Sequence, residues 1–325
     1  MIKQSPESDM PEPFRTYVAQ RSLGIAQVLG DVIGERNVQL CPRAVLPNEL
    51  IFWGEDLVYG AVVSRLSDGY KSVLYNGAFS DLSGVGICTD DIDHGFSFAR
   101  EEFRKNNTVR IKNPIESDGN GQHVIEHLED FESSFIELSL ECSGEVVVMP
   151  NIDLITKRVS IGSIDLGRDG EFTYMGREKQ VLKNGVYVYG GTKIGLFEAN
   201  DSDMQEEVEI CYDIPTALSE LGKKAIELYK GIALKTGRVS FDIIRGETWS
   251  GQEIDSVIDI TPRVGGVTPA EVLAIKYMKD KGNHLTYSES RLLFEPEFVP
   301  ITGPYSVNFV DTNSLIINAS VTGAI

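Results

Sequence analysis

The sequence has 325 residues, of which 42% are hydrophobic and 24% are charged, a composition typical of folded proteins. Its 49 acidic and 30 basic residues give a formal net charge of -19, which repels nucleic acid backbones and anionic membrane surfaces. No stretch approaches the ~20 apolar residues of a membrane span, and the N-terminal MIKQSPESDMPEP lacks an apolar signal core. We therefore expect a cytoplasmic protein without nucleic acid or membrane partners.

A chain of this length favours two or three lobes around a cleft over a single core. The four cysteines, Cys41, Cys88, Cys142 and Cys211, have no paired spacing, and we interpret them as buried free thiols. Among the four histidines only His123 and His127 share an i, i+4 spacing, without further ligands nearby in the sequence that would indicate zinc.

The N-terminal third alternates between helical and strand patterns. Apolar residues at helical spacing predict a helix over 14–33, and short β-rich runs separated by Gly and Asp predict strands at 49–54, 58–63 and 72–75. The aromatic and charged stretch 91–106 predicts a short helix that leads into the next strand.

The middle of the chain is predicted to be rich in β-structure. Residues 109–112, VRIK, form a strand, and the glycine loop SDGNGQ follows at 117–122. We expect a helix over 124–131 and, after it, the strands 135–140, 145–149, 159–164, 170–173 and 185–189.

The C-terminal third predicts an α+β arrangement. Its clearest element is a helix over 215–236, preceded by an acidic stretch at 198–209 that is either an exposed loop or the start of a helix. Two buried strands, 239–244 and 257–260, precede a helix near Thr268, for which Thr268, Pro269 and Glu271 predict an N-cap with a capping box. Polar and apolar residues alternate over 292–317, a pattern that indicates edge strands.

Lys112 and the glycines that follow it are candidates for binding phosphate. A lysine at a strand end neutralises phosphate charge, and the exposed backbone N–H groups of Gly119 and Gly121 can bind phosphate oxygens. The alternative is a surface lysine beside an ordinary β-turn. The loop has neither the GK[ST] ending of a P-loop nor a G-x-G-x-x-G dinucleotide motif.

Asp242 and Asp259 are candidate metal ligands because each lies within an otherwise apolar strand. A carboxylate in such a strand is costly unless it is paired or binds a cation, and Mg²⁺ prefers oxygen ligands. One alternative is that the alternation of side chains along a strand turns both carboxylates to solvent. The other is that each carboxylate pairs with a nearby arginine. Arg263 follows in a PRVGG turn, where glycines let the backbone approach a ligand closely.

The order and spacing of VRIK, SDGNGQ and VIDITPRVGGVTPAE resemble the ATP-grasp superfamily of ATP-dependent ligases, in a poorly characterised bacterial branch. The resemblance implies an α+β fold of two lobes that enclose a nucleotide cleft. It divides the chain into a short N-terminal α/β domain (1–90), a small β-rich lobe with the glycine loop (91–190) and a large lobe with the metal-binding strands (191–325).

The resemblance also implies roles for individual residues. Asp242, Asp259 and Thr261 would bind Mg²⁺, with Asp and Thr standing where the family usually has Glu and Asn, and Lys112 and Arg263 would stabilise charge during catalysis. The nucleotide-binding set comprises Lys71, Lys112, Gly119, Gly121, Gln122, Glu137, Leu138, Leu140, Glu145 and Lys179; within it, residues 137–140 correspond to the hinge that faces adenine and Glu145 to the acid that holds the ribose.

With ATP and Mg²⁺ as cofactors, the implied activity is a carboxylate–amine ligase that activates a small-molecule carboxylate as an acylphosphate for attack by an amine. The resemblance also allows a homodimer. The alternative that we carry forward is a catalytically reduced protein on the same fold that only binds a nucleotide or metabolite.

Overall fold

In the computed structural model the described residues are 50–52, 58–60, 74–75, 79, 82, 86–114, 121–141, 144–165, 170–183, 186–231, 238–261, 266–294, 303–310 and 315–325. The helix predicted over 14–33 and most of the predicted N-terminal domain lie outside them. Leu74 and Tyr75 are helical, so the strand predicted over 72–75 is wrong there. The described helices are α3 (Ile92–Arg104), η5 (Leu128–Asp130), α4 (Phe131–Glu141), α5 (Ser202–Tyr212), α6 (Thr216–Gly231) and α7 (Thr268–Lys281).

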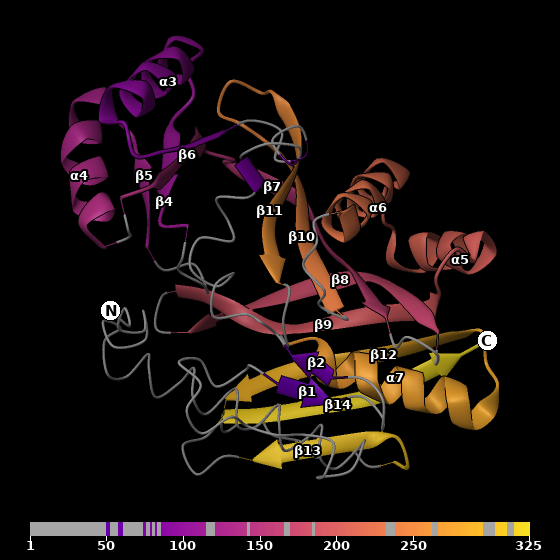
Figure 1. Cartoon of the computed structure of the whole chain (residues 1–325). Coiled ribbons are helices and arrows are strands. Elements are labelled where there is room, and N and C mark those ends of the chain that lie inside the picture. The colour runs from indigo at the N-terminus through magenta and orange to yellow at the C-terminus, as the bar shows by residue number, and fades with distance from the viewer. Residues whose placement is uncertain are drawn as a thin grey trace.

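The strands form three sheets (Figure 1). β1 (Leu50–Phe52) pairs with β2 (Val58–Gly60). A four-stranded sheet has the order β3-β6-β4-β5, with β3 (Ile87–Thr89), β4 (Val109–Lys112), β5 (Gln122–Ile125) and β6 (Val146–Pro150). An eight-stranded sheet has the order β11-β10-β7-β8-β9-β12-β14-β13, with β7 (Leu154–Asp165), β8 (Glu171–Lys183), β9 (Val186–Glu198), β10 (Arg238–Glu247), β11 (Glu253–Thr261), β12 (Leu285–Phe294), β13 (Ser306–Val310) and β14 (Leu315–Ala324).

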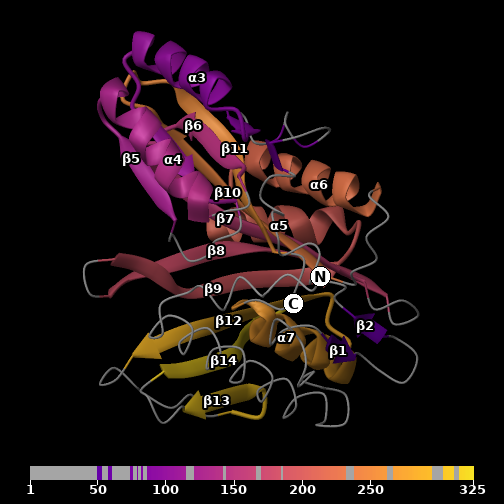
Figure 2. The same ribbon diagram turned by 60° about the vertical axis from the view of Figure 1, so that its left-hand side comes forward.

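One face of the four-stranded sheet is covered by α3 and α4 (Figures 1 and 2). Alternate residues of β4, Val109 and Ile111, are buried in a core with Phe131, Phe135 and Leu138 of α4. The strand predicted over 135–140 is therefore wrong, because the helical spacing of these three apolar residues matches the side of α4 that meets the sheet. The helix predicted over 124–131 is wrong at 124–125, which belong to β5, whereas Leu128–Asp130 form η5 and Phe131 begins α4.

The other face of the four-stranded sheet is turned toward the eight-stranded sheet. Val147 and Met149 of β6 belong to the same apolar core as Phe241 of β10 and Val257 of β11. Cross-strand partners share a face of a sheet, so Lys112, which pairs with Val147, lies on this inner face. Lys112 therefore lies on the face of the small sheet that contributes to this core, which also contains Leu74, Tyr75, Phe79 and Leu82.

The chain passes from the four-stranded to the eight-stranded sheet at residues 151–153. Asn151 Oδ1 accepts bonds of 3.0 and 2.8 Å from the Arg110 guanidinium, and the Asp153 N–H donates to the Glu247 carbonyl over 2.9 Å. Strands β7, β8 and β9 all belong to the larger sheet. This short link is therefore bonded to both sheets.

The eight-stranded sheet has one apolar face, covered by α5 and α6. A cross-strand row on this face runs through Phe241, Ile161, Met175, Gly195 and Tyr287. A side chain on Gly222 of α6 would meet Ile161 at 2.5 Å, and one on Gly195 would meet Val208 of α5 at 2.5 Å. Glycine at these two points lets the helices pack directly on the sheet.

The opposite face of the same sheet is more polar. The neighbouring row contains Asp242, Ser160, Gly176, Ile194 and Ser288. Helix α7 packs on the β9, β12 and β14 part of this face, where Ser288 Oγ donates to the Ala270 carbonyl over 2.9 Å (Figure 1). The candidate ligands of the sequence analysis are found on this polar face.

Two local predictions are corrected. Helix α7 does begin at Thr268, but its N-cap is Val267, which makes no side-chain cap bond, and both carboxylate oxygens of Glu271 bind Arg238. Cys88 is half-buried and Cys211 is exposed, so the expectation of buried thiols is wrong for Cys211.

Candidate functional site

The centre of the candidate site is the pair Asp242 and Asp259. They are direct cross-strand partners on β10 and β11, and a register irregularity follows immediately between Asp242 and Ile243. Cβ atoms of such partners lie ~5 Å apart on one face of the sheet. The fold therefore opposes the two carboxylates that the sequence analysis singled out, and both side chains are half-buried.

Ser160 and Glu178 complete the surroundings of Asp242. Ser160 of β7 is the other cross-strand neighbour of Asp242 and hydrogen-bonds its side chain. Glu178 lies two residues beyond Gly176 on β8 and so shares the polar face. Burial first, and then the charges of Glu178 and Asp259, raise the pKa of the Asp242 carboxyl well above its usual range. Asp242, Glu178 and Asp259 thus bring three carboxyl groups close together, and a bound cation would offset their mutual repulsion.

The donor set suits Mg²⁺ bound in part by another ligand. Among the described residues, no group of three or more His, Cys, Asp or Glu side chains is arranged to hold a metal ion by itself. Mg²⁺, however, commonly takes only one or two protein carboxylates and completes its octahedral shell with water and substrate phosphates. Two opposed aspartates fit that pattern, whereas an all-protein metal cage is not present in this part of the chain.

On the four-stranded sheet, Lys112 lies beside Arg110 on the inner face. The Arg110 guanidinium donates to Gln122 Oε1 over 2.9 Å as well as to Asn151. Its burial lowers the pKa of Arg110, an effect that the charge of Asp153 opposes. Gly121 has a left-handed φ of 58°, and its carbonyl accepts a 2.7 Å bond from the Asn113 N–H. Lys112, Gly121 and Gln122 therefore lie close together.

The predicted hinge residues lie elsewhere. Glu137 and Leu140 are exposed on α4, and Leu138 is buried on the side of that helix facing the sheet. The helix covers the outer face of the four-stranded sheet, so these three residues do not face the Asp242–Asp259 pair, and the link at 151–153 joins the sheets instead.

The remaining predicted residues are separated. Glu145 is exposed and immediately precedes β6, at the end of that strand away from the link. Lys179 is exposed and adjoins Glu178 on β8, so strand alternation turns it to the α5 and α6 side of the sheet. Thr261 ends β11 opposite Ser240. Lys71, Gly119 and Arg263 lie outside the described residues.

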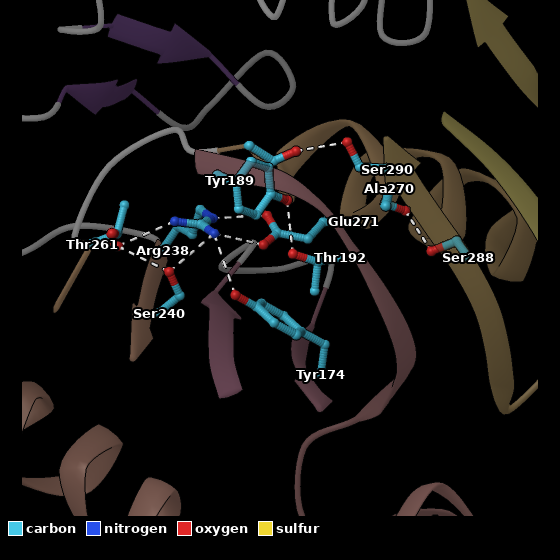
Figure 3. A network of polar contacts seen from close by, with 11 residues as sticks. Tyr174, Tyr189, Thr192, Arg238, Ser240, Thr261, Ala270, Glu271, Ser288 and Ser290 are labelled. Carbon is cyan, nitrogen blue, oxygen red and sulfur yellow. Dashed lines mark hydrogen bonds and ion pairs between the residues drawn. The ribbon is translucent and has the colours of Figure 1, made fainter. Parts of the chain in front are cut away.

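A buried polar network involves residues of the two strands that carry the aspartate pair, β10 and β11. Figure 3 shows this network. Arg238 of β10 binds Glu271 of α7 through two hydrogen bonds of 2.7 Å, and both side chains are almost fully buried. Burial alone lowers the pKa of the guanidinium, but the Glu271 carboxylate reverses this and the pKa of Arg238 is raised. Arg238 also donates to the Thr261 carbonyl over 3.1 Å. The network thus joins the strand of Asp259 to α7.

With this geometry established, a family model matches residues 83–296, more than half of the chain; the family is described as "Protein of unknown function (DUF3182)". The chain belongs to this family. No curated protein matches the sequence. Among the described helices, none combines the length and apolar character that a membrane crossing requires.

Solved structures resemble this DUF3182 chain in fold. Two match over 80% of the chain with a TM-score of 0.50 and 11% sequence identity: the biotin carboxylase domain of Hydrogenobacter thermophilus 2-oxoglutarate carboxylase in complex with MgADP, ADP and bicarbonate, and a biotin carboxylase–βγ-ATP complex from Campylobacter jejuni. Rhizobium etli pyruvate carboxylase matches with the same TM-score, identity and coverage of this chain, over 26% of its own length.

These similarities confirm the predicted α+β ATP-grasp fold. At 11% identity they carry no residue roles. The chain spans 63% of the length of the first two structures, so their whole activities do not transfer to this DUF3182 member.

Sequence reasoning missed Ser160, Glu178 and the Arg238–Glu271 pair. One signal was present: Arg238, Ser240 and Asp242 alternate along β10 and therefore share its polar face. Glu271 was assigned to a capping box because its partner Arg238 is 33 residues away in the sequence. Ser160 and Glu178 gave no local signal, because only strand pairing brings them beside Asp242.

Proposed function

We propose that this protein is an ATP-dependent ligase that activates a small-molecule carboxylate as an acylphosphate, which an amine then attacks. The observation that carries the proposal is the opposition of Asp242 and Asp259 across β10 and β11, on the polar face of an ATP-grasp fold. Two carboxylates held against each other are unfavourable without a cation, and metal-bound triphosphate is the ligand that such a pair suits.

In this proposal Asp242, Asp259 and Thr261 provide the oxygen-rich site for Mg²⁺, and Ser160 keeps the Asp242 carboxylate in place through its hydrogen bond. Bound Mg²⁺ would neutralise phosphate charge and orient the triphosphate. Lys112 contributes positive charge from the inner face of the small sheet, and the loop that ends at Gly121 and Gln122 offers backbone N–H groups to phosphate. Arg263 and Lys71 remain proposed contributors of positive charge.

The role of the adenine-facing hinge belongs, in our proposal, to residues 151–153 and not to residues 137–140. This link is bonded to both sheets, through Asn151 to Arg110 and through Asp153 to the Glu247 carbonyl. Arg110 keeps the link in place and, through Gln122, connects it to the end of the glycine loop. Lys179 is not part of the proposed site, because it lies on the opposite face of β8 from Glu178.

The proposed chemistry has two balanced steps. A carboxylate oxygen of the substrate attacks the γ-phosphorus of ATP, the bond from that phosphorus to the bridging oxygen breaks, and ADP leaves with the electron pair. The amine nitrogen then attacks the acyl carbon, the bond to the phosphate oxygen breaks, and phosphate leaves while the nitrogen releases a proton. Positioning and charge neutralisation suffice for both steps, so the protein needs no nucleophilic side chain.

The first test is ligand binding followed by turnover. Mg-ATP at 100 times its dissociation constant should stabilise the fold by roughly 2.7 kcal/mol, measured as a thermal shift. ADP release is then measured with a panel of carboxylic acids and amines. The absence of any shift with Mg-ATP would sink the proposal, whereas a shift without ADP release for any pair would favour the nucleotide-binding alternative.

Two variants of β11 sharpen this test. Asp259→Ala should abolish ADP release, because one of the two opposed ligands is lost. Glu253→Gln is the matched control: Glu253 lies on the same strand but is exposed near the far end of β11, 3.8 Å from Arg245. Turnover by Asp259→Ala equal to that of Glu253→Gln would remove Asp259 from the mechanism.

A further inference from the structure

The connection between β11 and α7 is held at both ends by buried polar side chains, Arg238 and Glu271 at one end and Ser290 at the other. We infer that Arg238 and Glu271 are positioning residues, which fix the end of β11 against α7 and thereby hold Asp259 opposite Asp242. The inference rests on the proposed function for its link to metal binding, and on the geometry alone for the positioning itself.

Arg238 uses its whole guanidinium for this purpose (Figure 3). Nε and one terminal nitrogen hold the two oxygens of Glu271, each over 2.7 Å, and the other terminal nitrogen donates to the Thr261 carbonyl over 3.1 Å. Tyr174 and Ser240 accept weaker bonds of 3.4 and 3.3 Å. One planar group therefore ties together the strand end and the helix.

The far side of the connection is fastened independently. Ser290 Oγ donates to the Gly266 carbonyl over 2.7 Å, and a Cβ on Gly266 would lie 2.3 Å from the Tyr189 ring. The Tyr189 hydroxyl is itself bonded to Thr192 over 2.7 Å (Figure 3). Side chains from β9 and β12 thus hold the chain just before α7, as Arg238 holds the last residue of β11.

The energetics favour positioning over stability as the role of the pair. A buried ion pair is often replaced by apolar residues of similar volume with little loss of stability, because desolvation offsets the Coulombic attraction. What apolar residues cannot reproduce is the bond to the Thr261 carbonyl. That carbonyl is two residues from Asp259, on the strand whose register sets the distance between the two carboxylates.

The test uses two variants and one matched control in the full chain. Arg238→Lys keeps the charge but cannot bind Glu271 and Thr261 as a planar fork. The double variant Arg238→Met with Glu271→Met removes both charges without leaving either buried alone. Arg245→Lys is the control, since Arg245 forms an equivalent fork of 2.7 and 2.6 Å with Asp255 on the same two strands, away from Thr261.

Two measurements are made on each protein: amide hydrogen exchange of residues 258–268, and Mn²⁺ affinity by electron paramagnetic resonance. In Arg238→Lys we expect about tenfold faster amide exchange in that segment. We also expect about tenfold weaker Mn²⁺ binding, which is typical when a residue that orients the metal ligands is lost. Arg245→Lys should leave both quantities within about twofold. If Arg238→Lys does not fold, the double variant is judged by the same criteria.

Unchanged exchange over 258–268 would overturn the positioning role, and faster exchange with unchanged Mn²⁺ affinity would overturn its connection to the aspartate pair. Wild-type protein that binds neither Mn²⁺ nor Mg-ATP would contradict the proposed function instead. In that case the exchange measurement alone still decides whether Arg238 and Glu271 fix the end of β11.

Discussion

Asp242 and Asp259 face each other across β10 and β11, and the only register irregularity between these two strands comes directly after Asp242. Like charges directly opposite on a sheet are destabilising. The burial and the nearby Glu178 that raise the pKa of Asp242 add to that cost. The pair is thus a local weakness of the fold that a bound cation would turn into a favourable interaction.

Replacing one carboxylate of this pair should stabilise the protein when no divalent cation is present. We expect Asp242→Asn to raise the free energy of unfolding by about 0.5 kcal/mol at pH 7, since the amide can keep the hydrogen bond with Ser160. Urea unfolding in chelated buffer measures the change. Asp255→Asn is the control and should be destabilising, because it breaks the ion pair with Arg245.

Added Mg²⁺ should reverse this order of stability. Wild-type protein gains more stability from the cation than Asp242→Asn does. When the free energy of unfolding is plotted against Mg²⁺ concentration, the curves of the two proteins should therefore cross. A variant that is less stable than wild type in chelated buffer would contradict the prediction that the opposed carboxylates repel.

Gly266 should tolerate no side chain. Its Cβ would lie 2.3 Å from the Tyr189 ring, so we expect Gly266→Ala to lower the free energy of unfolding by about 1–3 kcal/mol through overpacking. Thermal or urea unfolding measures the loss, and Gly231→Ala, with no atom within 4 Å of the added Cβ, should be nearly neutral. The cost should shrink in a Tyr189→Leu background; an equal cost there would show that the ring is not the obstacle.

Arg110 should contribute to stability through the link between the sheets. Arg110→Met removes three donated hydrogen bonds and leaves the oxygens of Asn151 and Gln122 without this donor, so we expect a loss of about 1–3 kcal/mol in urea unfolding. Arg110→Lys should recover less than half, because an ammonium cannot bind both partners as a fork. Arg104→Met, which removes an exposed pair with Glu101, should cost less than about 0.5 kcal/mol. Equal losses for Arg104→Met and Arg110→Met would contradict this role.

Asp213 should make stability depend on acid pH. It ends α5 with a left-handed φ of 49° and binds Lys157 and Arg177, and the hydrogen bond from Lys157, followed by that residue's charge, lowers the pKa of Asp213. A lowered pKa gives stability that is present above the unfolded value of about 3.9 and is lost as the pH falls through the folded value.

Asp213→Asn, which tolerates the left-handed backbone, should therefore melt below wild type at neutral pH, and the two melting temperatures should converge as the pH falls to about 3. Because the pair is exposed, 1 M salt should reduce the difference at pH 7. A gap in melting temperature that stays constant from pH 7 to pH 3 would show that the carboxylate charge is not its origin.

The α+β architecture and the candidate metal ligands followed from the sequence because each depends on local patterns. Asp242 and Asp259 were recognisable as carboxylates within short apolar strands, and 92–104 and 216–231 as helices. Between 124 and 141 the local pattern was ambiguous. Phe131, Phe135 and Leu138 fit a helix, while Ile136, Leu138 and Leu140 alternate as in a strand, and packing of the first set against the sheet and α3 decided for the helix.

Only the tertiary structure decided which polar side chains meet. Strand pairing set Ser160 beside Asp242 and made residues 151–153 the link between the sheets. Packing of α7 on the polar face gave Glu271 a buried partner instead of a place in a capping box. Periodicity within a segment indicates its secondary structure and the face that it buries, but contacts between distant segments depend on register and layer packing, which no local pattern of residues encodes.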